Sequence, residues 1–303
     1  MNDMTKLTIF TASYNRADLI YRLYLTLKNQ TCKDFEWLVV DDGSTDGTEE
    51  LFLNKIIPDS QIDIRFFRNK TNLGLIRSLN FGVSNAIGEY FAKVDSDDYV
   101  VNDYVEYLCS LIDKLPDDKT IYGVAGLKVN SDGKPLKLSE PCFPNDSSYV
   151  LATDLERKKY NLDADMAEAW RTDVLRQFPF PVWKTEKFAP EQITFFDIAL
   201  EGYRIVWTKK PLVICEYLEG GLTKGASQLE KQNPMGYSMM YNQRLKYEEG
   251  FINRAKTAAY FCALCHVGGN PTYCFKCTSK ILGFFAFIPG WILSFRRRKQ
   301  YSE

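Results

Sequence analysis

The chain has 303 residues, 45% of them hydrophobic and 14% aromatic, which is enough to bury a substantial core and is not typical of a disordered protein. Its formal net charge is −1, so no general basic surface favours nucleic acid as a partner. No positively charged and then apolar leader precedes Leu7, and we therefore expect a cytoplasmic rather than a secreted protein.

Apolar, strand-like runs alternate with helix-like segments through the first third of the chain. In chain order the pattern predicts strands at residues 7–10, 37–40, 62–67 and 90–94, with helices over residues 16–29, 48–54, 75–86 and 103–115. Alternation of this kind gives right-handed βαβ units and a ligand crevice at the carboxyl ends of the strands. The sequence therefore predicts a Rossmann-like α/β fold with a mostly parallel sheet flanked by helices.

Carboxylates gather where two of these strands end. Asp41 and Asp42 follow the second strand, and Asp95, Asp97 and Asp98 follow the fourth. These groups would converge at one edge of the sheet, and crowded carboxylates are tolerable only in water or around a cation. A divalent cation that carries a phosphorylated ligand is the simplest interpretation. A solvated turn at the first cluster and a helix-capping role for the second are the structural alternatives.

Five short segments, taken in order, are similar to the N-terminal half of a known enzyme family. They read TASYNR, VVDDGSTDGT, NKTNLG, SLNFGV and GEYFAKVDSDD. Together they resemble the inverting, metal-dependent glycosyltransferases of family 2, which have the A-type (GT-A) nucleotide-sugar fold. Further along, FAPEQITFFDIALEGYRIVWTKKPLVICEYLEGGLT resembles the stretch that carries the catalytic base in that family.

The resemblance implies a division of the chain into three parts. Residues 1–120 would form the half of a GT-A domain that binds the nucleotide sugar. Residues 121–235 would form the half that binds the acceptor and supplies the catalytic base. Residues 236–303 would add a C-terminal helical region with a hydrophobic and basic tail that associates with a membrane.

The resemblance also implies which residues bind the donor. In the family, the loop after the first strand contacts the nucleobase, and the acid after the second strand binds the uracil or ribose side. The expected nucleotide-sugar site comprises Ala12, Tyr14, Arg16, Asp41, Asp42, Asn72, Gly74, Arg77, Asn80, Asp95, Ser96 and Asp97. One position departs from the family, which commonly has an arginine directly before the asparagine of SLN. This chain has Leu79 there and Arg77 two residues earlier, so Arg77 either reaches the donor or lies on the helix surface.

The DSDD string is the candidate metal site. Mn²⁺ or Mg²⁺ is usually bound by one or two carboxylates and completes its shell with phosphate oxygens and water. Such an ion would stabilise the charge that develops on the departing diphosphate. The string can be aligned in two registers, so the ligand is Asp97 or Asp98.

Inversion at the anomeric carbon needs one base that removes the proton of the acceptor hydroxyl. The family often has an acidic pair at the start of a helix, with the second acid as the base. This chain has Glu191 followed by Gln192, so we predict that Glu191 is the base and hold Asp197 in reserve. A helix that begins after Pro190 would favour the ionised carboxylate. A helix-terminal carboxylate without chemistry is the alternative.

The function that these features favour is transfer of a sugar from a nucleotide diphosphate donor, most simply a UDP-sugar, to a glycan or lipid-linked acceptor. By resemblance, the setting would be bacterial surface polysaccharide synthesis. A sugar-phosphate nucleotidylyltransferase would need a glycine-rich phosphate loop after the first strand, which TASYNR lacks. A receiver-like signalling module would leave the second half of the chain unexplained. A catalytically inactive sugar-nucleotide-binding protein remains an alternative, because the position of the base is irregular.

The C-terminal tail reads ILGFFAFIPGWILSF over residues 281–295 and is followed at once by RRRK. The apolar run is shorter than the roughly twenty residues that span a bilayer, and it contains Pro289 and Gly290. We expect a bent interfacial segment that attaches the protein peripherally to the cytoplasmic face of the inner membrane. A buried helix or a dimer contact is the alternative.

Cysteine usage leaves one question open. Four of the eight cysteines, Cys262, Cys265, Cys274 and Cys277, form two CxxC pairs around the only histidine, His266. The eight-residue gap between the pairs is shorter than in common zinc sites. A zinc knuckle and a helix that carries small buried thiols are both compatible with the sequence, and the helix is favoured.

Overall fold

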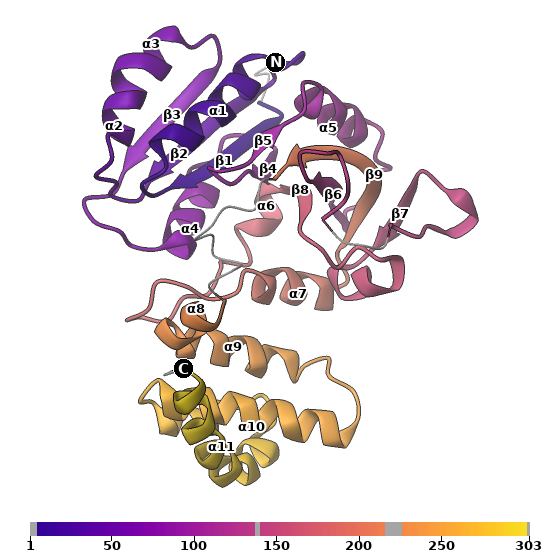
Figure 1. The fold of residues 1–303 in the computed structure, drawn as a ribbon. Coiled ribbons are helices and arrows are strands. Elements are labelled where there is room, and N and C mark those ends of the chain that lie inside the picture. The colour runs from indigo at the N-terminus through magenta and orange to yellow at the C-terminus, as the bar shows by residue number, and fades with distance from the viewer. Residues whose placement is uncertain (1–4, 137–139, 216–225, 302–303) are drawn as a thin grey trace. The chain divides into compact units, whose positions relative to one another are not determined.

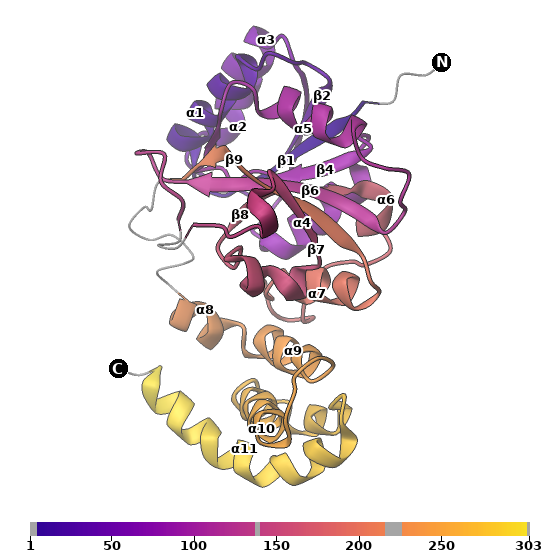
Figure 2. The ribbon, with the colours of Figure 1, turned by 90° about the vertical axis from the view of Figure 1, so that its right-hand side faces the viewer.

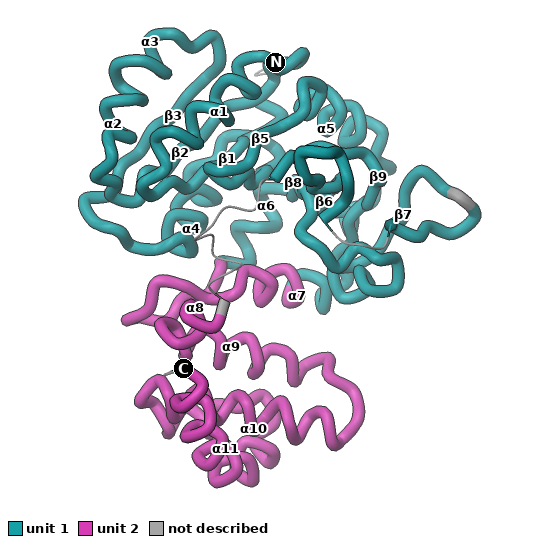
Figure 3. Tube along the Cα trace, in the orientation of Figure 1, with its two compact units in different colours: residues 1–179, 198–217 teal, residues 180–197, 218–303 magenta. Residues whose placement is uncertain are grey.

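A computed structural model describes residues 5–136, 140–215 and 226–301 of the chain. The chain divides into two compact units, one made of residues 1–179 and 198–217 and the other of residues 180–197 and 218–303 (Figure 3). The expected division at residues 120 and 235 stays a prediction. The last part of the stretch compared with the catalytic-base region, residues 216–223, lies outside the described residues.

Unit 1 is built on one nine-stranded sheet within the described residues (Figure 1). Its strands are β1 (Leu7–Ser13), β2 (Phe35–Asp41), β3 (Asp63–Arg68), β4 (Tyr90–Lys93), β5 (Tyr99–Val100), β6 (Ile121–Val129), β7 (Tyr149–Ala152), β8 (Met166–Arg171) and β9 (Arg204–Ile214). The order across the sheet is β3-β2-β1-β4-β8-β6-β9-β5, with β7 paired to β9. All four strands that the apolar runs predicted are present.

The sheet is mixed, which corrects the expectation of a mostly parallel one. Strands β3, β2, β1 and β4 are parallel, as the βαβ pattern predicted. Strand β8 then runs antiparallel to both β4 and β6, and β9 runs antiparallel to β5 and β7. The antiparallel strands come from the second half, where short β-like runs and turns replace the regular alternation with helices.

The helices of unit 1 alternate with its strands along the chain. They are α1 (Ala17–Lys28), α2 (Thr48–Leu51), a π-helical turn (Phe52–Ile56), α3 (Ile57–Asp59), α4 (Leu75–Asn85), α5 (Tyr104–Asp113) and α6 (Thr172–Leu175), with 3-10 turns at Pro144–Asp146 and Asp154–Tyr160. On one face, Leu23 of α1 and Leu108 of α5 join Ile9 of β1 in the main core. On the other face, α4 comes so close to β1 that a Cβ at Gly82 would lie 2.3 Å from the ring of Phe10. Both faces of β1 are therefore buried, as its apolar sequence requires.

Unit 2 is helical within the described residues (Figure 2). It contains α8 (Ala226–Gln232), α9 (Pro234–Arg244), α10 (Phe251–Val267), a 3-10 turn (Pro271–Lys276) and α11 (Lys280–Gln300), while α7 (Gln192–Leu200) begins in this unit and ends in unit 1. Helix α11 continues through Pro289, so this proline does not interrupt the helix. A Cβ at Gly290 would lie 2.4 Å from Cβ of Cys262, which explains why a glycine stands where α11 meets α10.

The four clustered cysteines lie in the core of unit 2. Cys262 and Cys265 come from α10, and Cys274 and Cys277 come from the 3-10 turn and its end. All four are buried free thiols, and the Sγ of Cys262 donates a 3.7 Å hydrogen bond to the carbonyl of Gly283. They pack here as small apolar side chains between α10 and α11.

Candidate functional site

The candidate site lies along the edge formed by the carboxyl ends of β1 to β4. These strands are parallel and adjacent, so the loops that follow them share one edge of the sheet (Figure 1). Every residue expected to bind the nucleotide sugar lies at a strand end, on one of these loops, or in α4. In sheets of this type that edge is where nucleotides bind.

The loops after β1 and β2 are tied to each other. The N–H of Asn15 donates to Oγ of Ser44 at 2.9 Å, and the N–H of Thr45 donates to Oδ1 of Asn15 at 2.8 Å. Asn15 has a φ of 53°, a left-handed conformation that asparagine tolerates better than most residues. The loop that carries Tyr14 and Arg16 is therefore held against the loop that begins with Asp41.

Asp41 is an internal anchor of the second loop. Its side chain is fully buried, and its Oδ1 accepts the N–H of Ser44 at 3.1 Å. Arg68, at the end of β3, places Nε 3.3 Å from the other carboxylate oxygen and donates to the carbonyl of Ser44 at 2.9 Å. Arg68 also pairs with Glu49. Sequence reasoning missed Arg68, although an arginine at the end of a strand in the same edge was a signal for it.

Both carboxylate oxygens of Asp42 accept hydrogen bonds from other residues of the chain. Oδ1 accepts the side-chain N–H of Asn69 at 2.8 Å and the backbone N–H of Leu73 at 2.9 Å, and Oδ2 accepts the N–H of Gly74 at 2.7 Å. Gly74 has a φ of 97°, which a residue with a side chain rarely adopts, and α4 begins directly after it. Asp42 thus fixes the start of α4, the helix that carries Arg77 and Asn80.

Two lysines from neighbouring strands pair with the Asp95–Asp98 turn, which the sequence did not predict. The Nζ of Lys128, from β6, lies 2.9 Å from Oδ2 of Asp98 and 3.1 Å from Oδ2 of Asp95. The Nζ of Lys93, from β4, lies 3.2 Å from Oδ1 of Asp95. Lys128 and Asp98 are buried. Two of the three carboxylates are therefore compensated by ammonium groups of the chain itself.

The pKa values of Asp95 and Asp98 are shifted in opposite directions. Burial alone would raise the pKa of Asp95, but Lys93 and Lys128 outweigh it and hold that pKa well below the usual range. Burial raises the pKa of Asp98 in spite of Lys128, and the neighbouring Asp95 adds to the rise. Burial would also lower the pKa of Lys128, but Asp95 and Asp98 keep it well above its usual value. Lys128 is therefore charged at neutral pH.

Asp97 differs from its two neighbours. No ion pair in the described part of the chain reaches its carboxylate, and its side chain is partly exposed. Its backbone carbonyl accepts a 2.7 Å hydrogen bond from Nη2 of Arg22, whose guanidinium also lies 4.4 Å from the ring centre of Tyr99. Arg22, from α1, thereby fixes the turn while the Asp97 carboxylate stays available.

The remaining predicted donor residues are placed as follows. Tyr14 is exposed, and Ala12, Asn72, Asn80 and Arg77 are partly exposed. The Nη1 of Arg77 donates to the carbonyl of Leu73, so this arginine supports the loop before α4. Arg16 donates to the carbonyl of Asn15, and Ser96 is buried in the turn. Whether they bind a nucleotide sugar stays a prediction.

The carboxylates of the Asp95–Asp98 turn could bind a divalent cation only together with other ligands. Among the residues that the structure describes, no group of three or more histidine, cysteine or carboxylate side chains could hold a metal ion by itself. An ion that draws most of its oxygen ligands from a diphosphate and water needs only one or two protein carboxylates. Asp97, with an uncompensated carboxylate, fits that requirement, and Asp98 fits it less well because Lys128 occupies its Oδ2.

The candidate base residues belong to unit 2. Glu191 stands directly before α7, as the sequence predicted for a helix start. Asp197, the reserve, is engaged by Lys246 at 2.6 Å and by Gln243 at 3.4 Å. Glu186 was missed: it is buried and accepts the N–H groups of Met235 and Gly236 at the start of α9. Its role is to cap that helix.

Unit 1 also contains a network of buried acidic side chains that we did not predict from the sequence. The Nη1 of Arg157 lies 3.7 Å from Asp154 and 3.4 Å from Glu168, and Tyr122 donates to Asp154 at 2.8 Å. One arginine serves two buried carboxyls. Burial raises the pKa of Glu168 to about 8 and that of Asp154 to about 6, although Arg157 opposes both shifts. Asp154 and Arg157 are only three residues apart, but Tyr122 lies on β6 and Glu168 on β8, so no local pattern reveals the whole cluster.

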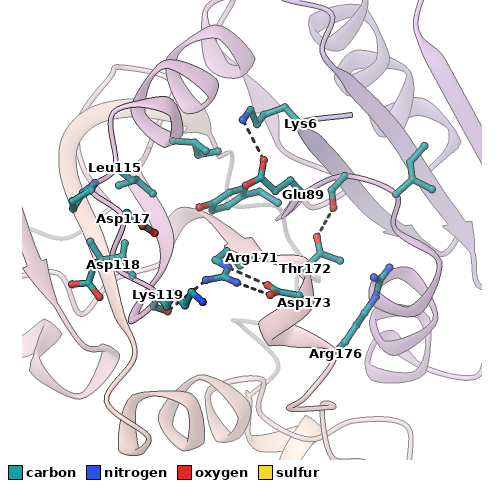
Figure 4. A pocket seen from close by; sticks show the side chains of 16 residues that line it. Lys6, Glu89, Leu115, Asp117, Asp118, Lys119, Arg171, Thr172, Asp173 and Arg176 are labelled. Carbon is teal, nitrogen blue, oxygen red and sulfur yellow. Dashed lines mark hydrogen bonds and ion pairs between the residues drawn. The ribbon is translucent and has the colours of Figure 1, made fainter. Parts of the chain in front are cut away.

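A cavity of about 460 Å³ lies at the other edge of the sheet, by the amino ends of β1, β4 and β6 (Figure 4). Two pairs of its charged side chains bind each other: Lys6 with Glu89 at 3.2 Å, and Arg171 with Asp173 at 2.5 Å. Because its location is opposite to the strand ends that carry the acidic loops, this cavity is not the predicted donor site.

Comparison with known proteins identifies the family. The profile of the family described as "Glycosyl transferase family 2" matches residues 8–168, which is more than half of the chain. The chain belongs to this family. The matched region contains the β1 to β4 loops and the Asp95–Asp98 turn, so the family assignment and the site geometry concern the same residues.

Curated relatives are similar over part of their length. An uncharacterized glycosyltransferase of Haemophilus influenzae is 33% identical over 116 residues, covering 38% of this chain and 35% of the relative. Glycosyltransferase GlyA of Streptococcus pneumoniae is 26% identical over 228 residues, covering 68% of this chain and 32% of the relative. Hyaluronan synthase of Pasteurella multocida is 36% identical over 135 residues, covering 42% of this chain and 13% of the relative. The chain therefore spans about a third or less of these relatives.

Solved structures share the fold at low identity. TarS residues 1–349 of S. aureus in complex with UDP-GlcNAc has a TM-score of 0.64 and 19% identity, with 94% of this chain and 79% of that chain covered. The mannosyltransferase PcManGT from Pyrobaculum calidifontis in complex with GDP-Man and Mn²⁺ has a TM-score of 0.54 and 16% identity, with 98% and 83% covered. The α/β GT-A-like fold is thereby confirmed.

Proposed function

We propose that this chain is an inverting glycosyltransferase that moves a sugar from a UDP-sugar to a glycan or lipid-linked acceptor in surface polysaccharide synthesis. The observation that carries the proposal is the set of interlocked acidic loops at the carboxyl edge of β1 to β4, inside the region that matches the family. The UDP-GlcNAc complex of TarS and the polymer named in hyaluronan synthase support the donor and acceptor classes.

Donor recognition follows from the chemistry of the loops. Tyr14 is exposed on the loop after β1 and can stack on a nucleobase. Asp42 has both oxygens engaged by backbone and side-chain donors, so its main contribution is to hold the start of α4 at the donor edge. A carboxylate has about four lone-pair sites, which leaves room for one further hydrogen bond from the nucleoside.

Asp97 would bind a divalent cation, Mn²⁺ or Mg²⁺, together with the donor diphosphate. The ion would act as a Lewis acid on the leaving nucleotide. The chain's own residues prepare this position: Arg22 holds the Asp97 carbonyl, and Lys93 and Lys128 hold the neighbouring acid, Asp95. The Mn²⁺ in the PcManGT complex supports use of such an ion.

Glu191 would act as the general base. Its carboxylate would take the proton from the acceptor hydroxyl as that oxygen attacks the anomeric carbon opposite the nucleotide, which inverts the configuration. Glu191 is preferred over Asp197 because it stands directly before α7, at the helix start where the family resemblance places the base.

Peripheral attachment to the cytoplasmic face of the inner membrane is the second part of the proposal. None of the helices in the described ranges is long and apolar enough to cross a membrane. Helix α11 buries small residues against α10 and exposes most of its large apolar ones: Ile281, Phe284, Phe285, Ile288, Trp291, Ile292 and Phe295. Arg296 and Lys299 follow, exposed, at the end of the same helix. An apolar helix face that ends in cations suits an anionic lipid surface.

The reaction is tested with the purified chain, Mn²⁺ and a panel of UDP-sugars and GDP-mannose. We expect UDP release from at least one UDP-sugar, and a product whose anomeric configuration is opposite to that of the donor, measured by NMR. Binding of a UDP-sugar without turnover on any acceptor would favour the inactive binding protein. Absence of nucleotide binding across the panel would exclude both functions.

A further inference from the structure

The acidic turn after β4 holds a cation that the chain supplies. The ammonium of Lys128 bridges Asp95 and Asp98 at 3.1 and 2.9 Å. The bridge is shielded from water, since the side chains of Lys128 and Asp98 are only 10% and 9% exposed. Lys128 comes from β6, 30 residues after Asp98, so the fold and not the local sequence places it there.

The charges at the turn determine how strongly it can attract a metal ion. Among the residues that the structure describes, the turn carries three carboxylates and Lys93 and Lys128 pair with two of them, which leaves the negative charge of Asp97. A divalent cation that approaches this turn alone meets a single net charge and two repelling ammonium groups. With the diphosphate of a donor present, two or more further negative charges become available. Cation binding should therefore depend on the nucleotide.

We propose that Lys128 is a resident counter-ion that prevents the turn from binding a divalent cation until the nucleotide donor is present. This inference rests on the proposed function, because it assigns Lys128 an effect on the cation and donor of that site. Lys128 is a positioning and specificity-determining residue in this scheme and does not touch the reacting atoms. A purely structural role, in which Lys128 only fixes the turn to β6, makes a different prediction for cation affinity.

The test measures Mn²⁺ affinity with and without UDP by calorimetry, and free Mn²⁺ by electron paramagnetic resonance. For the unaltered chain we expect weak binding of Mn²⁺ alone and at least tenfold tighter binding with UDP. Lys128→Met removes the ammonium and keeps a similar length, so it should bind Mn²⁺ alone at least tenfold more tightly and lose most of the UDP dependence. Lys128→Arg keeps the charge and should retain the behaviour of the unaltered chain.

Lys210→Met is the matched control, because Lys210 also pairs with an aspartate, Asp103 at 2.7 Å, but at an exposed position. It should leave the affinity for Mn²⁺ alone unchanged. An unchanged affinity in folded Lys128→Met would overturn the proposal and leave Lys128 a structural role. The measurement with Mn²⁺ alone needs neither donor nor acceptor, so its result is separate from a failure of the proposed function, which would appear as absent UDP binding.

Folding of the variant is itself informative. If Lys128→Met is unfolded in buffer, Lys128→Gln, which can still donate a hydrogen bond to one carboxylate, is measured in its place. Folding of either variant only in millimolar Mn²⁺ would support the proposal, because the ion would then occupy the role of the ammonium. Failure of both to fold with Mn²⁺ would show that a divalent cation cannot take that role and would overturn it.

Discussion

The carboxylate of Asp42 accepts the backbone N–H of Gly74 at 2.7 Å, which joins the end of β2 to the start of α4. The same carboxylate also accepts N–H groups from Leu73 and Asn69. Asp42 therefore holds the loop before α4 at the carboxyl edge of β1 to β4 before any ligand arrives. The family resemblance predicts that Asp42 contacts the nucleotide. In the structure its side chain supports the loop before α4.

Asp42→Ala should lower both stability and donor affinity. The substitution leaves two backbone donors and one side-chain donor without their acceptor, which costs about 1–3 kcal/mol of unfolding free energy. Donor affinity should fall because the start of α4 loses its anchor. Chemical denaturation and calorimetry with UDP measure the two effects. Asp63→Ala, at an exposed position at the start of β3, is the control. Full stability of the Asp42 variant would contradict the anchoring role.

Part of this site was accessible from the sequence and part was not, for a physical reason. The strands around Asp42 and Asp95 are recognisable because apolar periodicity is local. The partners of these acids are not local: Lys128 reaches Asp98 only through the pairing of β6 with β8 and β9. The antiparallel course of β8 was equally hidden, since its apolar run carries no sign of direction. Glu186 in sequence is one more charged residue, and only the position of α9 makes it a cap.

Asp97 should be the carboxylate on which the divalent cation depends. Asp97→Asn should lower turnover on the order of a hundredfold, the scale seen when one electrostatic contact to a transition state is lost. Chelation should abolish transfer, and Mn²⁺ or Mg²⁺ should restore it in the unaltered chain. Asp117→Asn, exposed at the opposite edge of the sheet, serves as the control. Full activity in excess chelator would refute the metal requirement.

Glu191→Gln should separate binding from chemistry. The amide keeps the size of the side chain and cannot accept the acceptor's proton, so turnover should fall by about 10²–10⁴ while UDP-sugar affinity stays nearly unchanged. Asp197→Asn is the comparison: it breaks an ion pair with Lys246, which should cost at most about 1 kcal/mol of stability, and should leave turnover within a few fold. If the Asp197 variant is the inactive one, the base is Asp197.

Stability should fall as the pH rises from about 5 to 8, because of Glu168. An unfolded glutamate loses its proton near pH 4.3, whereas burial raises the pKa of Glu168 to about 8 in the folded chain. Between these values the folded state binds more protons than the unfolded state, so the stabilising contribution is complete below pH 4 and is lost by about pH 8. Asp154, with a pKa of about 6, acts in the same direction.

Glu168→Gln should flatten this dependence. Glutamine imitates the protonated carboxyl at every pH, so the melting temperature of the variant should fall less between pH 5 and 8.5 than that of the unaltered chain. Glu201→Gln, at an exposed position, should follow the unaltered chain. Parallel melting curves for Glu168→Gln and the unaltered chain would mean that Glu168 is ionised throughout this range in the folded protein.

The exposed face of α11 should bind anionic membranes. Deleting the helix is a poor test, since Gly283, Ala286 and Gly290 are buried and removal would uncover α10. Replacing Phe284, Phe285 and Ile288 together by serine removes apolar surface that is already in water and should not harm the fold. Each side chain would contribute about 1.5–3 kcal/mol if fully inserted, and each exposed cation about 1 kcal/mol near an anionic leaflet. Arg297 contributes less because it pairs with Glu230.

Sedimentation with phosphatidylglycerol vesicles should therefore retain the unaltered chain and release the triple serine variant, with phosphatidylcholine vesicles binding both weakly. High salt should release the unaltered chain only in part, because it screens the cations and leaves the apolar contacts intact. The matched control replaces three exposed apolar residues elsewhere, Leu53, Ile87 and Leu200, by serine and should stay bound. If the unaltered chain ignored anionic vesicles while its oligomeric state changed in the triple variant, the α11 face would be a contact between copies of this chain.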